Sequence, residues 1–225
     1  MVSEMAAGER LAVRAIDKLC ANLADVIHAM AQPLTILQGR LDKSRVAQMN
    51  LSELRGLAHE SAKETDRLCN LFGYMQGFMV AETVEPCLSR QAVCPMLTHA
   101  AEGLQSFFKQ GGISLRLDMQ SDVPPVIADP RRMDQALSRM LLLVYGFSAA
   151  NDTIELAAVS PFDATHIVIR NARARPVLDK EARLKLALSE ANIRSQNGAL
   201  TWTTDPLSVQ IELPAASAEG EQGGL

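Results

Sequence analysis

Two long stretches with helical periodicity lie in the first third of the chain and constrain its fold more than any other feature. In the first stretch, apolar residues recur three and four positions apart, which places them on one side of an α-helix. These residues are Ile16, Leu19, Cys20, Leu23, Val26, Ile27, Met30, Leu34, Leu37 and Leu41. The second stretch runs from Leu51 to about Met79, after a mostly polar connection from Asp42 to Asn50. The pattern predicts an antiparallel helical hairpin, with Asn50 and Glu53 as a capping box at the start of its second helix.

The apolar stripe of each helix is too broad to be buried against one neighbour. Pairing of two hairpins into a four-helix bundle would remove both stripes from water, so we expect a homodimer. The alternative is that the stripes pack against the C-terminal half of the same chain.

After Pro86 the periodicity changes, and the remaining sequence predicts a mixed α+β layer. Helices are expected at 93–110, about 131–147 and about 179–196, and strands at 113–117, 123–127, 153–159, 166–170 and in a hairpin over 199–213. The predicted fold class is therefore α+β, with a helical hairpin followed by an α/β sandwich. We place the helical domain at 1–82, the α/β domain at 83–214 and a disordered, Gly-rich tail at 215–225.

The composition narrows the class of protein. The 225 residues are 48% hydrophobic and 21% charged with a net charge of −4, which argues against nucleic-acid binding as the main role.

No apolar run is long enough to cross a bilayer and no signal peptide is present at the start, so we expect a cytoplasmic protein without membrane contact. The four cysteines lack metal-ligand spacing, and we expect no metal site and reduced, mostly buried thiols. They are Cys20, Cys69, Cys87 and Cys94.

One histidine of the first helix is predicted to face solvent. His28 lies about 140° around the helix from the preceding apolar seam position. An exposed histidine is by itself an ordinary surface residue. Pro33, five residues later, is the unusual neighbour, because a proline inside a helix costs about 3 kcal/mol.

The residues around His28 resemble the phospho-acceptor box of bacterial histidine kinases, in which a proline kink follows the histidine. The matching residues are His28, Met30, Gln32, Pro33 and Leu34. Ala29 and Ala31 replace the acid and the base of that box. In the family the acid serves as a base in autophosphorylation, and Ala29 cannot do so.

The order of elements in the second half resembles the ATP-binding domain of the same kinases, and residues 125–137 resemble the sequence that leads into its asparagine box. In the family, asparagines on the following helix help to hold magnesium, which prefers oxygen ligands. Here Arg139 and Leu143 stand at those two places, and neither can bind the ion.

Two further nucleotide motifs of the family are altered. Residues 171–175, Asn-Ala-Arg-Ala-Arg, match an Asp-x-Gly-x-Gly motif without its acid or its glycines. Arg183 and Lys185 stand at the glycines of a turn that cradles phosphate, and only Gly198 matches a family glycine. The resemblance therefore implies a degenerate ATPase-like domain that needs no ATP and no other cofactor.

A hairpin with an exposed histidine joined to such a domain resembles the dimeric histidine phosphotransferases of bacterial phosphorelays, the ChpT type. The resemblance implies that His28 accepts a phosphoryl group from a receiver-domain aspartate and passes it to another receiver. An imidazole is largely neutral at cytoplasmic pH, and its neutral form is nucleophilic. The expected partners are response-regulator receiver domains, which bring their own magnesium, and a hybrid histidine kinase is a candidate upstream partner.

Receivers are expected to dock on the outer face of the hairpin. The predicted docking residues are Ala31, Gln32, Thr35, Gln38 and Gly39 on the first helix and Arg55 and His59 on the second. Asp25, one turn before His28, either orients the imidazole through a hydrogen bond or is a solvated carboxylate. His99 and His166 are expected to be structural.

Two other functions remain open. A pseudokinase scaffold or inhibitor would bind a kinase or a response regulator without carrying phosphate, and Ala29 and the altered glycine motifs fit this function as well. An active kinase with an unusual nucleotide site would bind ATP.

Overall fold

The computed structural model describes residues 2–42, 46–47, 49–120, 122–161 and 164–216, with side chains from Ile16 onward. The chain divides into two compact units, Met1–Val84 and Glu85–Leu225. The division lies two residues after the boundary placed at residue 82 from the sequence.

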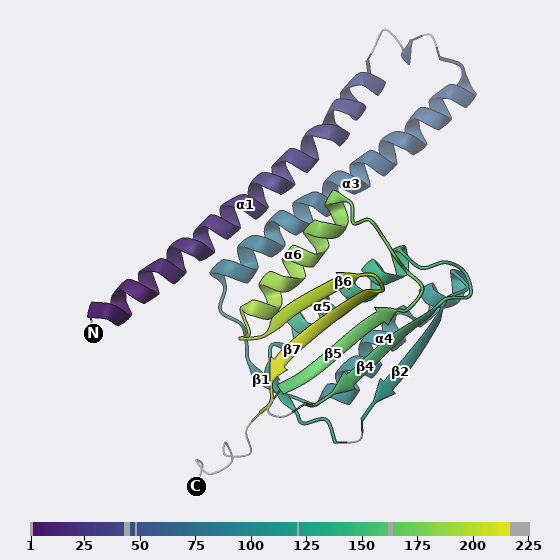
Figure 1. Ribbon diagram of the computed structural model, residues 1–225. Helices are drawn as coiled ribbons and strands as arrows, with labels where there is room; N and C mark the ends of the chain where they lie inside the picture. The colour runs from purple at the N-terminus through teal and green to yellow at the C-terminus, as the bar shows by residue number, and fades with distance from the viewer. Residues whose placement is uncertain (1, 43–45, 48, 121, 162–163, 217–225) are drawn as a thin grey trace. The chain divides into compact units, whose positions relative to one another are not determined.

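The first unit is a hairpin of two long helices, α1 (Val2–Arg40) and α3 (Leu51–Thr83), which pack along each other (Figure 1). The predicted capping box starts α3. The Asn50 side chain accepts hydrogen bonds from the N–H groups of Ser52 and Glu53 at 3.0 Å each. The Glu53 carboxylate in turn accepts from the Asn50 N–H at 2.8 Å. These bonds satisfy amides that the first helical turn would otherwise leave unpaired.

The apolar stripes of the hairpin are only partly covered within one chain. Val26, Met30 and Pro33 of α1 are buried, as are Leu71 and Phe78 of α3. The large apolar side chains that stay exposed on the hairpin are Ile16, Ile27, Leu34, Leu41, Leu51, Leu54, Phe72, Met79 and Val80.

The second unit is a five-stranded sheet with three helices on one face (Figure 1). Its strands are β2 (Ser114–Met119), β4 (Thr153–Val159), β5 (Ala164–Asn171), β7 (Leu207–Pro214) and β6 (Ala199–Thr204), in that spatial order. Its helices are α4 (Val93–Gln110), α5 (Pro130–Gly146) and α6 (Lys180–Arg194). Only the β2–β4 pair is parallel, and the other neighbours are antiparallel. A second sheet of two short strands pairs β1 (Ser89–Gln91) with β3 (Val126–Ala128).

Alternation in the sequence explains which face of the sheet is covered. Buried and partly exposed residues alternate along β4 and β5, as expected for strands with one face on a core. The buried residues Ile154, Leu156, Ile167 and Ile169 join residues of α4 and α5 in one hydrophobic core. Helix α5 begins at Pro130, a residue suited to the first helical position, directly after the N-cap Asp129.

Most elements follow the ranges expected from the sequence, and the differences have local causes. Strand β1 was not predicted, because three mostly exposed residues carry no clear alternation. The predicted disordered tail begins two residues too early: Ala215 forms a β-bridge with Val126, and the Ala216 N–H donates to the Pro125 carbonyl at 2.7 Å. Residues 217–225 of that tail lie outside the described residues.

The prediction of mostly buried thiols is wrong. Cys20, Cys69 and Cys87 are exposed and Cys94 is half-buried, and all four are free. Cys20 and Cys69 lie on faces of the hairpin helices that the same chain does not cover, which the sequence pattern could not distinguish from covered ones.

In the described part of the chain, no helix combines the length and the apolar composition that a membrane span requires.

Candidate functional site

His28 lies on α1 with its side chain exposed, as its position in the helical pattern predicts. The helix runs through Pro33 to Arg40. Because proline has no N–H, Pro33 cannot donate to the carbonyl of Ala29, four residues earlier. The residue next to His28 therefore carries a main-chain oxygen without its usual helical partner, on a helix that is otherwise continuous.

The predicted docking residues of α1 share the exposed face of His28. Asp25, Ala31, Gln32, Thr35, Gln38 and Gly39 are all exposed. After His28, these residues follow at steps of three or four positions. They therefore lie in line along one face of the helix, over about 16 Å from His28 to Gly39. The Thr35 hydroxyl donates to the Ala31 carbonyl at 2.8 Å, so it is engaged with its own helix. Apart from its chain neighbours and the backbone of its own helix, no described atom lies within 4 Å of where a Cβ would stand at Gly39, which leaves the end of this face open.

The two predicted residues of α3 are exposed but are not brought beside His28. An ion pair between Arg40 Nη1 and Glu60 Oε2 at 3.4 Å sets the register of the two helices. Arg40 is twelve residues beyond His28, a rise of about 18 Å. His59, next to Glu60, is therefore level with the far end of α1, and Arg55, five residues before Glu60, lies still further from His28.

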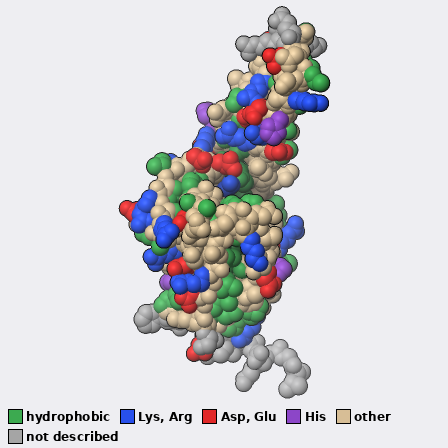
Figure 2. Space-filling view, turned by 90° about the vertical axis from the view of Figure 1, so that its right-hand side faces the viewer, with side chains coloured by type: hydrophobic (Ala, Val, Ile, Leu, Met, Phe, Trp, Pro, Cys, Tyr) green, Lys and Arg blue, Asp and Glu red, His purple; other side chains and the backbone are tan. Residues whose placement is uncertain are grey.

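Opposite charges flank this end of the hairpin. Lys63 Nζ lies 3.1 Å from Glu60 Oε1, and the hydrogen bonds from Lys63 and then Arg40 lower the pKa of Glu60 below its ordinary value. Histidines and both kinds of charge are visible on the surface of the hairpin in Figure 2.

The remaining histidines lie in the second unit. His99 is exposed on α4 rather than packed in the core. His166 is half-buried on β5, where its Nδ1 lies 3.1 Å from Gln210 Nε2 and its Nε2 lies 3.7 Å from Glu212 Oε2. Both partners belong to the neighbouring strand β7, so the contacts of His166 tie two strands together.

Asn171, which stands at the place of the adenine-binding acid in the resemblance, is buried at the end of β5. Its amide nitrogen donates to Ser148 Oγ at 2.8 Å and to Asp152 Oδ2 at 3.0 Å. Its carbonyl oxygen accepts from the N–H groups of Arg173 and Ala174. Both ends of the side chain are therefore engaged within the protein.

Asp152 completes this network. The hydrogen bond from the Asn171 amide, followed by that from the Ala149 N–H, holds the pKa of Asp152 below its ordinary value, although burial opposes the shift. Arg173 Nη1 lies 3.7 Å from Asp152 Oδ1 and acts in the same direction. The network fixes the turn that leaves β5.

The residues that stand at the asparagines and at the phosphate-turn glycines in the resemblance lie on α5 and α6. Leu143 is buried on α5. Lys185 lies within α6, where its Nζ pairs with Glu181 Oε1 at 3.1 Å. A pocket of about 210 Å³ lies between the two helices, and its lining includes Leu142, Leu143, Phe147, Ala182 and Lys185. The lining thus presents apolar side chains, the acids Asp179 and Glu181 and the paired Lys185, near the places where the resemblance puts asparagines and glycines.

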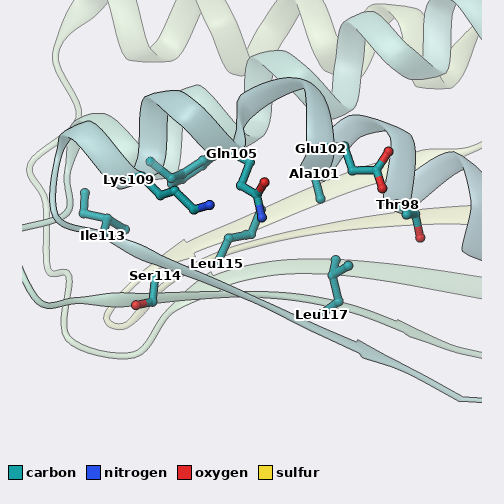
Figure 3. Close-up of a pocket in the computed structure, with 10 residues that line it drawn as sticks. Thr98, Ala101, Glu102, Gln105, Lys109, Ile113, Ser114, Leu115 and Leu117 are labelled. Atoms are coloured by element: carbon teal, nitrogen blue, oxygen red, sulfur yellow. The ribbon is translucent and has the colours of Figure 1, made fainter.

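A larger pocket of about 410 Å³ lies between α4 and β2, and the sequence did not predict it (Figure 3). The only related feature of the sequence is the alternation in Ile113–Leu117, which predicts a strand. It does not predict that this strand lies at the edge of the sheet, where the pocket forms. Among the described residues, no three His, Cys, Asp or Glu side chains converge in a way that could hold a metal ion.

Comparison with known proteins identifies the fold through solved structures alone. No model of a known protein family matches the chain, and no curated protein matches it. The Acinetobacter baumannii histidine kinase AdeS matches with a TM-score of 0.68 and 18% identity, over 84% of this chain and 98% of that one.

Two larger kinases match as well. Histidine kinase ThkA, in its complex with the response regulator protein TrrA, matches with a TM-score of 0.70 and 15% identity over 92% of this chain and 64% of that one. Full-length ShkA in complex with AMPPNP matches with a TM-score of 0.59 and 18% identity over 86% of this chain and 46% of that one. The chain has the fold of histidine kinases, a helical hairpin followed by an ATPase-like α/β domain, and the predicted α+β class is confirmed.

Proposed function

We propose that this chain, which has a histidine-kinase-like fold, is a histidine phosphotransferase of a bacterial two-component phosphorelay. His28 would carry a phosphoryl group between receiver-domain aspartates in the cytoplasm, without use of ATP. The observation that supports this function is the combination of an exposed His28 with nucleotide places whose side chains are engaged within the protein.

In the proposed step, a ring nitrogen of neutral His28 attacks the phosphorus atom of an aspartyl phosphate on the receiver. The N–P bond forms as the P–O bond to the aspartate breaks, and the carboxylate leaves with the bonding electrons. A magnesium ion held by the receiver would supply the stabilisation of charge on the phosphoryl oxygens. The reverse step on a second receiver completes the transfer and regenerates the imidazole.

The exposed face from His28 to Gly39 is the proposed docking surface for the receiver. The other side chains of this face, from Ala31 to Gln38, carry no charge, and Gly39 has no side chain, so a partner can approach the helix closely. Asp25 is one turn before His28 and would accept a hydrogen bond from the ring nitrogen that does not react. The ThkA structure contains a histidine kinase in complex with a response regulator, which supports the choice of partner class.

We also propose that the hairpin dimerises into a four-helix bundle. Ile27 and Leu34 are 60% and 53% exposed in the single chain, and both belong to the apolar stripe of α1. Exposed side chains of this size on both helices favour a second hairpin as the cover.

The deciding experiment is phosphoryl transfer from labelled phospho-receivers to the purified full chain. We expect label on the wild type and on His99→Ala, which removes an exposed histidine of the second unit, but none on His28→Ala. The transfer function fails if His28→Ala is labelled to the same level as the wild type, or if no receiver labels the wild type.

The second function is a pseudokinase scaffold that binds a kinase or a response regulator without carrying phosphate. Ala29 favours it, because the side chain next to His28 cannot act as a base. A scaffold would bind its partner equally well as wild type and as His28→Ala, with no labelling of either.

The remaining function is an active kinase, which calorimetry with ATP tests. Saturable ATP binding would indicate an active kinase, whereas we expect no binding.

A further inference from the structure

Strand β2 lies at the edge of the five-stranded sheet. It pairs with β4 on one side, and no described strand pairs with it on the other. An edge strand offers unpaired main-chain N–H and C=O groups to another strand. The residues of β2 are Ser114, Leu115, Arg116, Leu117, Asp118 and Met119.

The parallel register with β4 decides which residues offer those groups. The Ser114 N–H donates to the Asp152 carbonyl at 2.9 Å, and the Gln120 N–H donates to the Ala158 carbonyl at 3.3 Å. In a parallel pair the residues that bond to one neighbour alternate with those that face away from it. The even-numbered residues therefore bond to β4, and Leu115, Leu117 and Met119 direct their main-chain groups to the open edge.

The side chains of the same three residues lie on the helix-covered face of the sheet. Leu115 and Met119 pack partly on the core, whereas Leu117 is 38% exposed. Leu115 and Leu117 line the pocket of about 410 Å³ against α4, together with Ala101 and Phe108. Figure 3 shows side chains of α4 and β2 projecting into this space from both sides. Leu115 and Leu117 thus border a space that is not filled, and its α4 side also carries the polar residues Thr98, Glu102, Gln105 and Lys109.

The opposite, solvent-facing side of β2 carries two opposite charges. Arg116 is exposed and its Nη2 lies 2.7 Å from Glu155 Oε1 on β4. The Asp118 side chain is exposed and has no hydrogen bond or ion pair among the described residues. The strand therefore reads Leu-Arg-Leu-Asp-Met, with an apolar residue at each end, a leucine in the centre and opposite charges between.

We propose that β2 pairs antiparallel with β2 of a second copy of this chain, on a two-fold axis at Leu117. The two Leu117 residues would then form a hydrogen-bonded pair, and Leu115 would pair in the same way with Met119 of the second copy. These are the residues whose main-chain groups face the open edge. Arg116 would lie directly opposite Asp118 of the second copy, in the closer non-hydrogen-bonded position, on both sides of the axis.

The charges of Arg116 and Asp118 favour the two-fold axis at Leu117 and a second copy of this chain as the partner. A two-fold axis at Arg116 would put two arginines opposite each other, and an axis at Asp118 would put two aspartates opposite each other, both of which are unfavourable. Only the axis at Leu117 gives two ion pairs and a continuous apolar row of Leu115, Leu117 and Met119 from both strands. Self-complementarity of this kind is what a two-fold interface requires.

This inference does not rest on phosphotransfer by His28. It adds a second two-fold contact to the proposed hairpin dimer. Two different two-fold contacts on one chain link dimers into larger assemblies, so the average mass should rise with concentration beyond that of a dimer.

The test is sedimentation velocity of the full chain over a concentration series at low salt. Asp118→Arg places an arginine opposite Arg116 of the second copy, and we expect the wild type to reach about twice the average mass of this variant at the highest concentration. Arg116→Asp should also associate less. An equimolar mixture of the two variants, and the double variant Arg116→Asp/Asp118→Arg, restore opposite charges across the axis and should recover the wild-type mass.

Amide hydrogen exchange gives a second readout that needs no variant of Arg116. The amides of Leu115, Leu117 and Met119 should become protected as the wild-type concentration rises, and not in Asp118→Arg, while the Arg116 amide is protected by β4 throughout. Equal masses for wild type and Asp118→Arg overturn the proposal, as does a mixture that fails to associate. Protection of these amides only upon addition of a different protein also overturns it, because the edge would then serve another partner.

Discussion

Gly198 is the one nucleotide-domain glycine that the chain shares with the kinase pattern, and the structure gives it a role in packing. A Cβ at this position would lie 2.6 Å from the main-chain oxygen of Glu212 and 2.8 Å from Ile193 Cγ2. The first of these atoms cannot move without displacing β7. The glycine is therefore explained by close approach of the backbone, with no ligand involved.

Gly198→Ala is expected to destabilise the second unit by about 1–3 kcal/mol, because the added methyl group overpacks the turn before β6. The measurement is urea unfolding followed by circular dichroism. Gly103→Ala is the matched control. A Cβ there would meet no described atom beyond its chain neighbours and its own helix backbone, and alanine is a better helix former, so α4 should gain about 0.5–1 kcal/mol. A Gly198→Ala protein as stable as the control would contradict the packing argument.

The carboxylate of Asp152 makes stability depend on pH. Its pKa is held below the ordinary value of 3.8 by the Asn171 amide, the Ala149 N–H and Arg173, although burial opposes the shift. A lowered pKa in the folded state adds stability that is fully present above the unfolded pKa and is lost as pH falls through the folded pKa. The urea midpoint should therefore fall below about pH 4 for this reason.

Asp152→Asn separates this contribution from the general effect of acid. The variant should be less stable than the wild type at pH 7 and should lose less stability between pH 5 and pH 3. Parallel pH profiles for the two proteins would show that the Asn171–Asp152 contact contributes nothing to the acid response.

At the scale of single elements, α1 contains a residue, Pro33, that disfavours the helix in which it lies. Pro33 removes one main-chain hydrogen bond from a continuous helix of 39 residues, one turn after His28. Pro33→Ala should restore that bond and raise the free energy of unfolding of the hairpin by up to about 3 kcal/mol. Thermal unfolding measures the gain.

The same variant tests whether the absence of a Pro33 N–H bond to the Ala29 carbonyl matters for transfer. If the local backbone at His28 serves the reaction, Pro33→Ala will be more stable and slower in phosphoryl transfer. A stabilised variant with an unchanged transfer rate would assign the proline no part in the reaction, while an unstable variant would contradict the stability argument.

At the scale of the whole molecule, the proposed hairpin dimer and the proposed β2 contact can be separated by mutation. Ile27→Glu or Leu34→Glu places a charge in the exposed apolar stripe and should shift the protein from dimer to monomer at low concentration, since burial of an unpaired charge is strongly unfavourable. Light scattering measures the mass. Gln38→Glu adds the same charge at an exposed position outside the stripe and should leave the dimer intact. A dimer that survives both stripe variants would exclude this interface.

Much of the fold could be predicted from the sequence, because its signals are local. The hairpin and its Asn50 cap, the alternation of β4 and β5 and the helix that starts at Pro130 all depend on the spacing of neighbouring residues. The exposure of His28 could be predicted for the same reason: a side chain on a long amphipathic helix faces the direction that the period of the helix dictates.

What only the tertiary structure decided depends on contacts between residues far apart in the sequence. The position of β2 at the sheet edge, the bridge of Ala215 to Val126 and the exposure of three cysteines leave no periodic signal. The bond of Asn171 to Asp152, 19 residues away, engages a buried side chain in a contact that the sequence did not indicate. Local spacing determines which face of an element is apolar, but only the packed chain determines whether anything covers that face.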